Sequence, residues 1–268
     1  MAAIEKTLYD LGRLDDLARG DSPIHRLAPL TKTLVAAAFL VFVISFPKYG
    51  LTGLVPFTLY PAVLIALGGL PPAALFRRLL PALPFVLCVS VFNPILDQKV
   101  VLFLGSLPVT GGWLSLAVIL LKFTLCVLAA LILAATTSLE DICSSLARLG
   151  LPRVLAGQLL FTYRYLRVLG EEAARTARAH NLRAPDAGGI PPRAWGSLAG
   201  RLLLRTYDRA QRIHQAMICR GFTGEIRPLR PAEMKAGDAA FLFLWTAFFA
   251  AARLYDLPRL IGRLLEGV

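Results

Sequence analysis

Two arginines are candidates for binding a partner through their guanidinium groups. Each lies at the end of a long helical pattern, directly before residues that break helices. Arg183 is followed by Ala184 and Pro185, and Arg220 is followed by Gly221. Proline disfavours helical geometry in the residue before it, and glycine suits the left-handed conformation that ends many helices. A cation at such an end gains about 0.3–1 kcal/mol from the helix dipole. A single arginine of this kind would be explained by helix capping. Two in consecutive helices are explained equally well by capping and by docking to a partner protein.

Other reactive residue types are scattered along the chain. The sequence has no GxxxxGK[ST] phosphate-binding loop, so ATP binding by that route is not expected. Lys122 is the one ionisable residue deep in an apolar run, and it could face the bundle interior, face a partner subunit or snorkel to the membrane surface. We therefore expect no catalytic site, no metal site and no cofactor. The dispersed acids and histidines are Asp141, Glu171, Glu172, Asp208, Glu225, His25, His180 and His214.

The two arginines end amphipathic patterns long enough to form rods. The first pattern runs from about Leu155 to Arg183 and the second from about Trp195 to Arg220. At 1.5 Å per residue, each helix would be on the order of 40 Å long. Both lie in a polar insert, residues 136–238, that holds 16 Arg or Lys against 9 Asp or Glu. A basic amphipathic helix beside a membrane often lies on anionic lipid, which is the simpler interpretation of each helix alone.

The composition indicates that lipid is the solvent for much of the chain. The 268 residues are 56% hydrophobic and 17% charged, whereas soluble domains are about 45–50% apolar and about 25% charged. This balance excludes a conventional soluble enzyme, a disordered tail and a small disulfide scaffold. The net charge of +12 comes from bases that flank apolar runs or lie in the insert, which points to membrane topology rather than to nucleic acid. We expect the four cysteines to be reduced thiols, and no cleavable signal peptide is evident.

The apolar runs predict an all-α polytopic membrane protein with about five spans and two long cytoplasmic helices before the last span. Prolines in the second and third runs predict kinks. Bases precede the first span and lie in the second connection, which places these two segments in the cytoplasm. With five spans, residues 136–238 are then cytoplasmic and the C-terminus is outside. Arg253, Arg259 and Arg263 oppose the placement of the C-terminus. The predicted regions are 1–135, 136–238 and 239–268. The predicted spans are Thr33–Phe46, Leu51–Leu67, Leu79–Leu96, Trp113–Ala135 and Ala239–Leu254.

The second tip resembles a known motif. Residues 216–224, Ala-Met-Ile-Cys-Arg-Gly-Phe-Thr-Gly, resemble the second Ala-Arg-Gly coupling motif of the transmembrane T components of energy-coupling factor (ECF) transporters. Residues 179–184, Ala-His-Asn-Leu-Arg-Ala, match the first motif more loosely. Leu182 and Cys219 replace the usual alanine and Ala184 replaces the usual glycine, while Arg178 is a rival for the first motif arginine.

Three further stretches resemble the cobalt-transport (CbiQ) branch of that family, so the resemblance covers nearly the whole chain. They are Asp21–Leu27 before the first span, Phe92–Pro94 at the end of the third and Ala135–Ser138 after the fourth. The combination is far more specific than any one stretch.

The resemblance implies a mechanical subunit in the cell inner (plasma) membrane. Such a subunit is not an enzyme: it links two ABC-type ATPases to a separate substrate-binding membrane protein, an S component similar to CbiM. The resemblance assigns ATPase coupling to the residues Arg183, Ala184, Cys219, Arg220 and Gly221, with Arg178 as the alternative. ATP-driven closure of the ATPases would move the tips and reorient the S component, here for cobalt uptake. The partners are then these proteins and the lipid bilayer, with no nucleic acid.

Three alternatives remain open at this point. An integral-membrane enzyme, such as a lipid-modifying transferase, would need grouped acids or histidines, which the sequence does not show. A secondary transporter would typically show inverted repeats or an intramembrane acid. A T component for nickel or for a vitamin fits the same motifs, because substrate choice is expected to lie in another subunit. Replacing Arg183 or Arg220 should loosen the ATPases more than replacing Arg193, which we expect on the connecting loop.

Overall fold

The computed structural model describes Ala18 and residues 20–48, 50–96, 100–104, 107–183, 190–224 and 234–254. Its contacts divide the chain into two units. We call residues 17–138 with 232–268 the bundle unit, and residues 1–16 with 139–231 the arginine-helix unit. Each is considered separately below.

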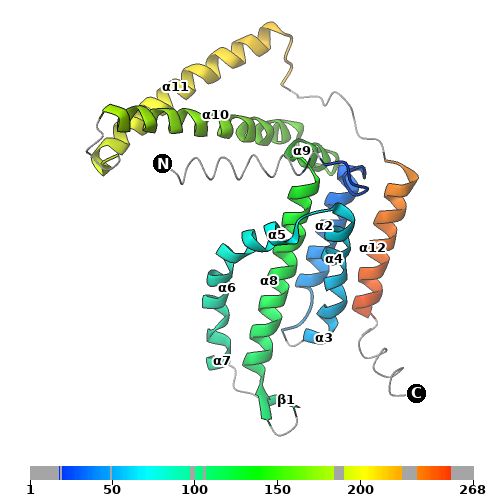
Figure 1. The fold of residues 1–268 in the computed structure, drawn as a ribbon. Helices are drawn as coiled ribbons and strands as arrows, with labels where there is room; N and C mark the ends of the chain where they lie inside the picture. Colours follow the sequence, from blue (N-terminus) through cyan, green and yellow to red (C-terminus); the bar gives the residue numbers. More distant parts are fainter. Residues whose placement is uncertain are drawn as a thin grey trace. The chain divides into compact units, whose positions relative to one another are not determined.

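The bundle unit is built from apolar helices that pack around α8, the longest helix of this unit (Figure 1). Helices α2, α4, α5, α6 and α7 all contact α8, and α12 packs on α2. Four stretches are long and apolar enough to cross a bilayer: 51–68, 72–94, 111–136 and 236–254. The helices are α2 (Pro29–Ile44), α3 (Leu51–Leu54), α4 (Leu59–Gly68), α5 (Pro72–Leu79), α6 (Leu83–Ser90), α7 (Phe92–Leu96), α8 (Gly111–Thr136) and α12 (Ala236–Leu254).

The first predicted span, α2, is shorter than the others. It contains 16 residues, which gives about 24 Å against a hydrocarbon core of about 30 Å. The predicted run Thr33–Phe46 needed flanking residues, from about Leu27 onward, to approach span length, and the helix begins at Pro29 and ends at Ile44. Proline favours the first turn of a helix, which explains the early start.

The predicted kinks are confirmed as short 3-10 segments. The segment η1 (Val55–Thr58) separates α3 from α4 and contains Pro56, and η2 (Leu80–Ala82) separates α5 from α6 and contains Pro81. Proline removes one N–H donor from the α-helical ladder and clashes with the preceding turn. The second and third predicted spans are therefore chains of short helices rather than straight rods.

A two-stranded hairpin interrupts the otherwise helical bundle unit. Strands β1 (Val100–Leu104) and β2 (Leu107–Thr110) pair antiparallel, with Val100 opposite Thr110 and Leu104 opposite Leu107. The sequence analysis treated this region only as a connection. The apolar and β-branched run at 100–104 suits a strand, and this short hairpin lies within an otherwise all-α fold.

Aromatic rings fill the centre of the bundle unit. Phe39 of α2, Phe57 of η1 and Phe249 of α12 are fully buried, and their ring centroids lie 5.4–6.0 Å apart. Tyr60 stacks on Phe39 and meets Trp245 edge to face. Ring pairs of this kind add to the energy of apolar burial. They join three segments that are far apart in the sequence.

Lys122, whose role the sequence left open, donates hydrogen bonds inside the bundle unit. Its Nζ lies 2.6 Å from the carbonyl oxygen of Phe46 and 3.3 Å from that of Ile44. Arg253 lies over the ring of Phe46 at 4.7 Å and donates to the carbonyl oxygen of Ser45. The end of α2 leaves carbonyls without intrahelical partners, and these two cations satisfy them. Lys122 is thus half-buried and bonded to the end of α2.

The arginine-helix unit consists, in its described part, of one short and two long helices. They are α9 (Leu139–Arg148), α10 (Arg153–Arg183) and α11 (Pro192–Cys219). The turn after α9 closes at Gly150, whose φ is +107°, and the N–H of Leu151 donates to the carbonyl oxygen of Leu146 at 3.0 Å. The long helices have 31 and 28 residues, which confirms the two predicted rods.

Candidate functional site

The end of α11 is fixed by a backbone cap at Gly221. The N–H of Gly221 donates to the carbonyl oxygen of Ile218 at 2.9 Å, and the N–H of Phe222 donates to that of Met217 at 3.0 Å. These two bonds form a Schellman motif, which requires a left-handed residue, and Gly221 has φ +78°. Arg220 is the capping residue itself, one position beyond the last helical residue, Cys219. The predicted cap is confirmed, and it holds the Arg220 backbone in one place.

The end of α10 carries the other predicted arginine. Arg183 is the last residue of this helix and its side chain is exposed. Arg178, the rival for the first motif arginine, is also exposed but lies five positions earlier within the helix. Ala184, predicted to follow the tip, lies outside the described residues. Arg193, which we expected on a loop, is instead the second residue of α11.

The two tips share one chemical feature besides the arginine. Leu182, beside Arg183, is 82% exposed, and Ile218, two residues before Arg220, is 56% exposed. Each tip therefore offers a guanidinium together with a large apolar side chain. Arginine is one of the residue types enriched among those that dominate protein–protein binding.

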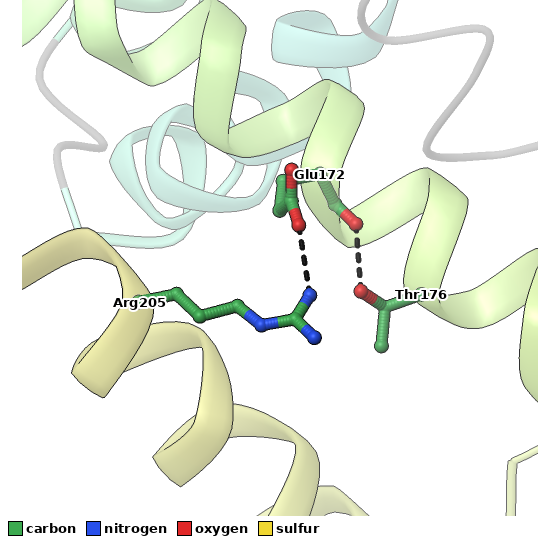
Figure 2. Close-up of polar contacts among 3 residues, drawn as sticks. All are labelled: Glu172, Thr176 and Arg205. Carbon is green, nitrogen blue, oxygen red and sulfur yellow. Dashed lines mark hydrogen bonds and ion pairs between the residues drawn. The ribbon is translucent and has the colours of Figure 1, made fainter. Parts of the chain in front are cut away.

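Helices α10 and α11 run in roughly opposite directions and cross (Figure 1). At the crossing, Nη1 of Arg205 lies 3.0 Å from Oε1 of Glu172, and the hydroxyl of Thr176 donates to the Glu172 carbonyl (Figure 2). A shallow pocket at the crossing is lined by Leu169, Glu172, Arg205, Thr206, Asp208, Arg209 and Arg212. In the sequence Glu172 is one of several dispersed acids, and its partner lies 33 residues away on another helix.

Both tips project well beyond this crossing. Arg220 lies fifteen positions after Arg205, and Arg183 lies eleven positions after Glu172. At 1.5 Å per residue the two arms are about 22 Å and about 16 Å long. Because the helices run in roughly opposite directions, the arms extend to opposite sides of the crossing (Figure 1).

We expect the Glu172–Arg205 pair to make a small contribution to the stability of the crossing. The Arg205 side chain is 69% exposed and that of Glu172 is 22% exposed, so solvent screens much of the attraction. Replacing either residue by glutamine should destabilise the chain by about 0.2–1 kcal/mol. A double-mutant cycle on thermal unfolding in detergent measures this coupling, and the reversed pair Glu172→Arg with Arg205→Glu should recover it.

The control for this cycle lies on α10 alone. Arg175 pairs with Glu171 at 3.4 Å within the same helix, and both side chains are mostly exposed. Arg175→Gln should leave the coupling between residues 172 and 205 unchanged. A coupling energy of zero, or an equal response to the control, would contradict the role of the pair at the crossing.

Two cysteines of the arginine-helix unit differ in exposure. Cys219 is exposed beside Arg220, whereas Cys143 of α9 is only 5% exposed. Burial raises the pKa of the Cys143 thiol, and the nearby Glu140 carboxylate raises it further. Both effects lower the fraction of the reactive thiolate at a given pH.

A maleimide should therefore modify Cys219 at least about tenfold faster than Cys143 at neutral pH, because only Cys219 combines access with an unburied thiol. Mass spectrometry of the separated peptides measures both rates in one sample. The rate at Cys143 should increase as the pH rises toward its raised pKa, and both thiols should react fully after denaturation. Equal rates in the folded protein would contradict the burial of Cys143.

The apolar positions of the long helices are only partly covered. Ala174 and Ala177 are buried, but large side chains on both helices remain exposed. Exposed faces of this size are typical of surfaces that meet a partner or a membrane. The exposed large residues are Val154, Leu155, Leu159, Leu166 and Leu182 on α10, and Trp195, Leu203, Leu204, Tyr207 and Ile218 on α11.

The remaining candidate groups form no reactive cluster in the part of the chain that the structure describes. No group of three or more His, Cys, Asp or Glu could hold a metal ion there. His25 serves as a cap: its Nε2 lies 3.4 Å from the carbonyl oxygen of Ala135, and its Nδ1 lies 2.6 Å from the Ser22 hydroxyl. Because a carbonyl can only accept, Nε2 donates, and in the neutral ring Nδ1 accepts from Ser22.

A family comparison matches most of the chain. The profile of the family CbiQ, described as cobalt transport protein, matches residues 20–230. The match includes both tips, the crossing and all described helices except α12.

Individual relatives carry related names. An energy-coupling factor transporter transmembrane protein EcfT from Thermosediminibacter oceani is 27% identical over 264 residues, covering 92% of this chain and 96% of the relative. The cobalt transport protein CbiQ of Rhodobacter capsulatus is 35% identical over 46% of this chain and 51% of its own length. The nickel permease LarQ of Lactiplantibacillus plantarum is 36% identical over one third of each chain. The matches to CbiQ and LarQ thus span about half of those relatives or less.

Proposed function

Because the chain belongs to the CbiQ family of cobalt transport proteins, we propose that it couples two cytoplasmic ABC-type ATPases to a substrate-binding membrane subunit. It is a multi-pass membrane protein and a transmembrane component of energy-coupling factor transporters. In this proposal the partner ATPases hydrolyse ATP, and this chain transmits their movement.

The observation that carries the proposal is the pair of projecting tips. Arg183 and Arg220 end the two longest helices, each beside an exposed apolar residue, and the arms point away from a common crossing. In the proposed assembly each tip enters a groove on one ATPase, where the arginine meets an acidic group. Burial of a charge pair in an interface makes its loss cost far more than the loss of an exposed pair. Ala184, Cys219 and Gly221 complete the proposed contacts, and Arg183 rather than Arg178 serves as the first motif arginine because it lies at the helix end.

Exposed apolar faces on α10 and α11 support a second partner. Leu203, Leu204 and Tyr207 are each more than 60% exposed on one long helix. Contact of such an apolar face with a membrane-embedded protein is more favourable than its exposure to water. We propose that the S component rests on these faces, so that movement of the tips reorients it.

The proposed orientation places residues 136–238 in the cytoplasm of the inner membrane. Arg77 and Arg78 lie in the last turn of α5, near the beginning of the apolar stretch 72–94, and the positive-inside rule puts that end of the stretch in the cytoplasm. The insert carries the tips and most of the remaining arginines. ATPases in the cytoplasm can reach the tips only with this orientation.

For the substrate we propose the cobalt ion, with nickel as the second candidate. The family description and the R. capsulatus relative both name cobalt. The likeness to the nickel permease LarQ favours nickel. In either case the ion is the transported substrate and is bound by the separate subunit. Identifying the S component that copurifies therefore identifies the substrate.

Affinity purification of the full chain from its native membrane in mild detergent tests the proposal. We expect two ABC-type ATPase chains and one small membrane subunit to copurify, and the reconstituted complex to take up Co²⁺ with ATP. Liposomes that contain this chain alone are the control and should take up nothing. Recovery of no ABC-type ATPase, or uptake by the chain alone, would overturn the proposal.

A further inference from the structure

Buried polar contacts join three helix ends at one end of the bundle unit. We name them the helix-end cluster, defined by His25, Lys32, the carbonyls of Ala135 and Thr136, and Asp238. Lys32 is 6% exposed, Thr136 is 3% exposed and Asp238 is 4% exposed. Charged residues are rarely buried to this extent without a specific role.

Asp238 caps two helices at once. Its Oδ1 accepts from the N–H of Ala28, the residue before α2, at 2.9 Å, and its Oδ2 accepts from the N–H of Lys235, the residue before α12, at 2.8 Å. Both N–H groups belong to helix N-termini, where a negative charge is favoured by the helix dipole. One carboxylate therefore ties the start of α2 to the start of α12.

Lys32 ties α2 to the end of α8. Its Nζ donates to the carbonyl oxygen of Thr136 at 2.7 Å, and His25 lies at hydrogen-bonding distance from the preceding carbonyl. Thr136 is the last residue of α8, where the dipole favours a cation. The contacts thus run from α8 through Lys32 and α2 to Asp238 and α12.

The helix-end cluster lies next to the short link that joins α8 to α9. Only Thr137 and Ser138 separate α8 from α9, whereas residues 220–235 separate α11 from α12. A displacement of α9 would reach Thr136, the residue that Lys32 holds, through this two-residue link.

Further polar groups at this end lack partners. The hydroxyls of Thr31 and Thr137 are buried and, in the described residues, make no hydrogen bond. Buried unsatisfied groups are uncommon and call for a physical reason.

We propose that Lys32 and Asp238 are positioning residues that make α2, α8 and α12 move together when the arginine helices are displaced. The proposal rests on the proposed coupling function and adds the route by which movement enters the membrane. Without the cluster the end of α8 would tilt alone, and the ATPases would hydrolyse ATP without reorienting the substrate-binding subunit.

Lys32→Met and Asp238→Asn test this in the complete complex in liposomes. Methionine keeps most of the side-chain length but cannot donate, and asparagine turns one acceptor of the cap into a donor. We expect ATPase association and ATP hydrolysis within about twofold of wild type, and Co²⁺ uptake per ATP hydrolysed lowered about five- to tenfold. Lys32→Arg, which can still donate to Thr136, should restore most of the uptake.

Lys122→Met is the matched control. Lys122 also donates to backbone carbonyls at an end of α2, at 2.6 Å, but at the end away from the cluster. A merely structural role predicts equal losses for Lys32→Met and Lys122→Met, whereas positioning predicts uncoupling only for Lys32→Met. Equal losses, unchanged uptake per ATP, or failure of both cluster variants to assemble would each overturn the inference. If the wild-type complex binds no ATPase, the proposed function and this inference fail together, whereas the other outcomes overturn only the inference.

Discussion

Arg220→Glu and Arg183→Glu should each abolish stable binding of the ATPases while leaving the chain folded in the membrane. Both side chains are exposed at helix ends, so their replacement removes no internal contact that the structure shows. Truncation of one member of a buried interfacial charge pair costs about 2–5 kcal/mol, which corresponds to about 30-fold to several thousandfold in Kd. Reversal of the charge should cost at least as much, because the acidic partner is then repelled. Titration of the purified chain with ATPase measures Kd directly.

Arg193→Glu is the matched control for these variants. It makes the same charge change on α11, at the opposite end from Arg220, and a helix N-terminus accommodates an acid. We expect its ATPase affinity to stay within about threefold of wild type, as is usual for charges at the edge of an interface. Arg178→Glu distinguishes the two candidates for the first motif arginine. Unchanged binding by both Arg183→Glu and Arg220→Glu would remove the tips from the coupling mechanism.

Gly221→Val should weaken ATPase binding although residue 221 need not touch the partner. The cap requires φ near +78°, where an L-residue is strained by about 1–2 kcal/mol. No atom lies within 4 Å of a Cβ placed there, so the penalty comes from the backbone alone. If the end of α11 refolds to relieve it, Arg220 loses its fixed position. The expected loss of affinity is about five- to thirtyfold, which is smaller than for Arg220→Glu.

A substitution series makes this expectation specific to the backbone. Asparagine tolerates the left-handed region better than alanine, and valine tolerates it least, so affinity should fall in the order Asn, Ala, Val. Gly200→Ala is the control on the same helix, because Gly200 lies in the helix interior with no atom within 4 Å of an added Cβ. It should stabilise α11 by about 0.5–1 kcal/mol and leave binding unchanged. Equal affinities across the series at 221 would separate the cap from coupling.

Local signals predicted the rods and the cap at Gly221. A Schellman cap depends on a few consecutive residues, so the sequence Arg-Gly-Phe at 220–222 was sufficient. The kinks at Pro56 and Pro81 were predictable for the same reason, because proline acts on its own turn. The end of α2 was less predictable, since its apolar pattern continues to Phe46 while the helix ends at Ile44.

Local sequence patterns did not predict the contacts between residues that are far apart in the chain. Asp238 marked only the end of the polar insert in the sequence analysis, yet it caps a helix start 210 residues away. The bonds of Lys122 to the carbonyls of Ile44 and Phe46 join residues 76 and 78 positions apart, so the sequence did not predict them. Glu172 and Arg205 likewise had no visible relation before their helices crossed.

The sequence by itself therefore determined which segments are helical, which are apolar enough for a membrane and where two arginines end the longest rods. These properties depend on periodicity, on transfer of side chains to lipid and on the geometry of single turns, all of which are local. Only the tertiary structure decided which cations cap which carbonyls, where the long helices cross and how three helix ends share Lys32 and Asp238. Those pairings depend on close packing, which brings together residues that are far apart in the chain. The hydrophobic pattern within one segment does not show which other segment will pack against it.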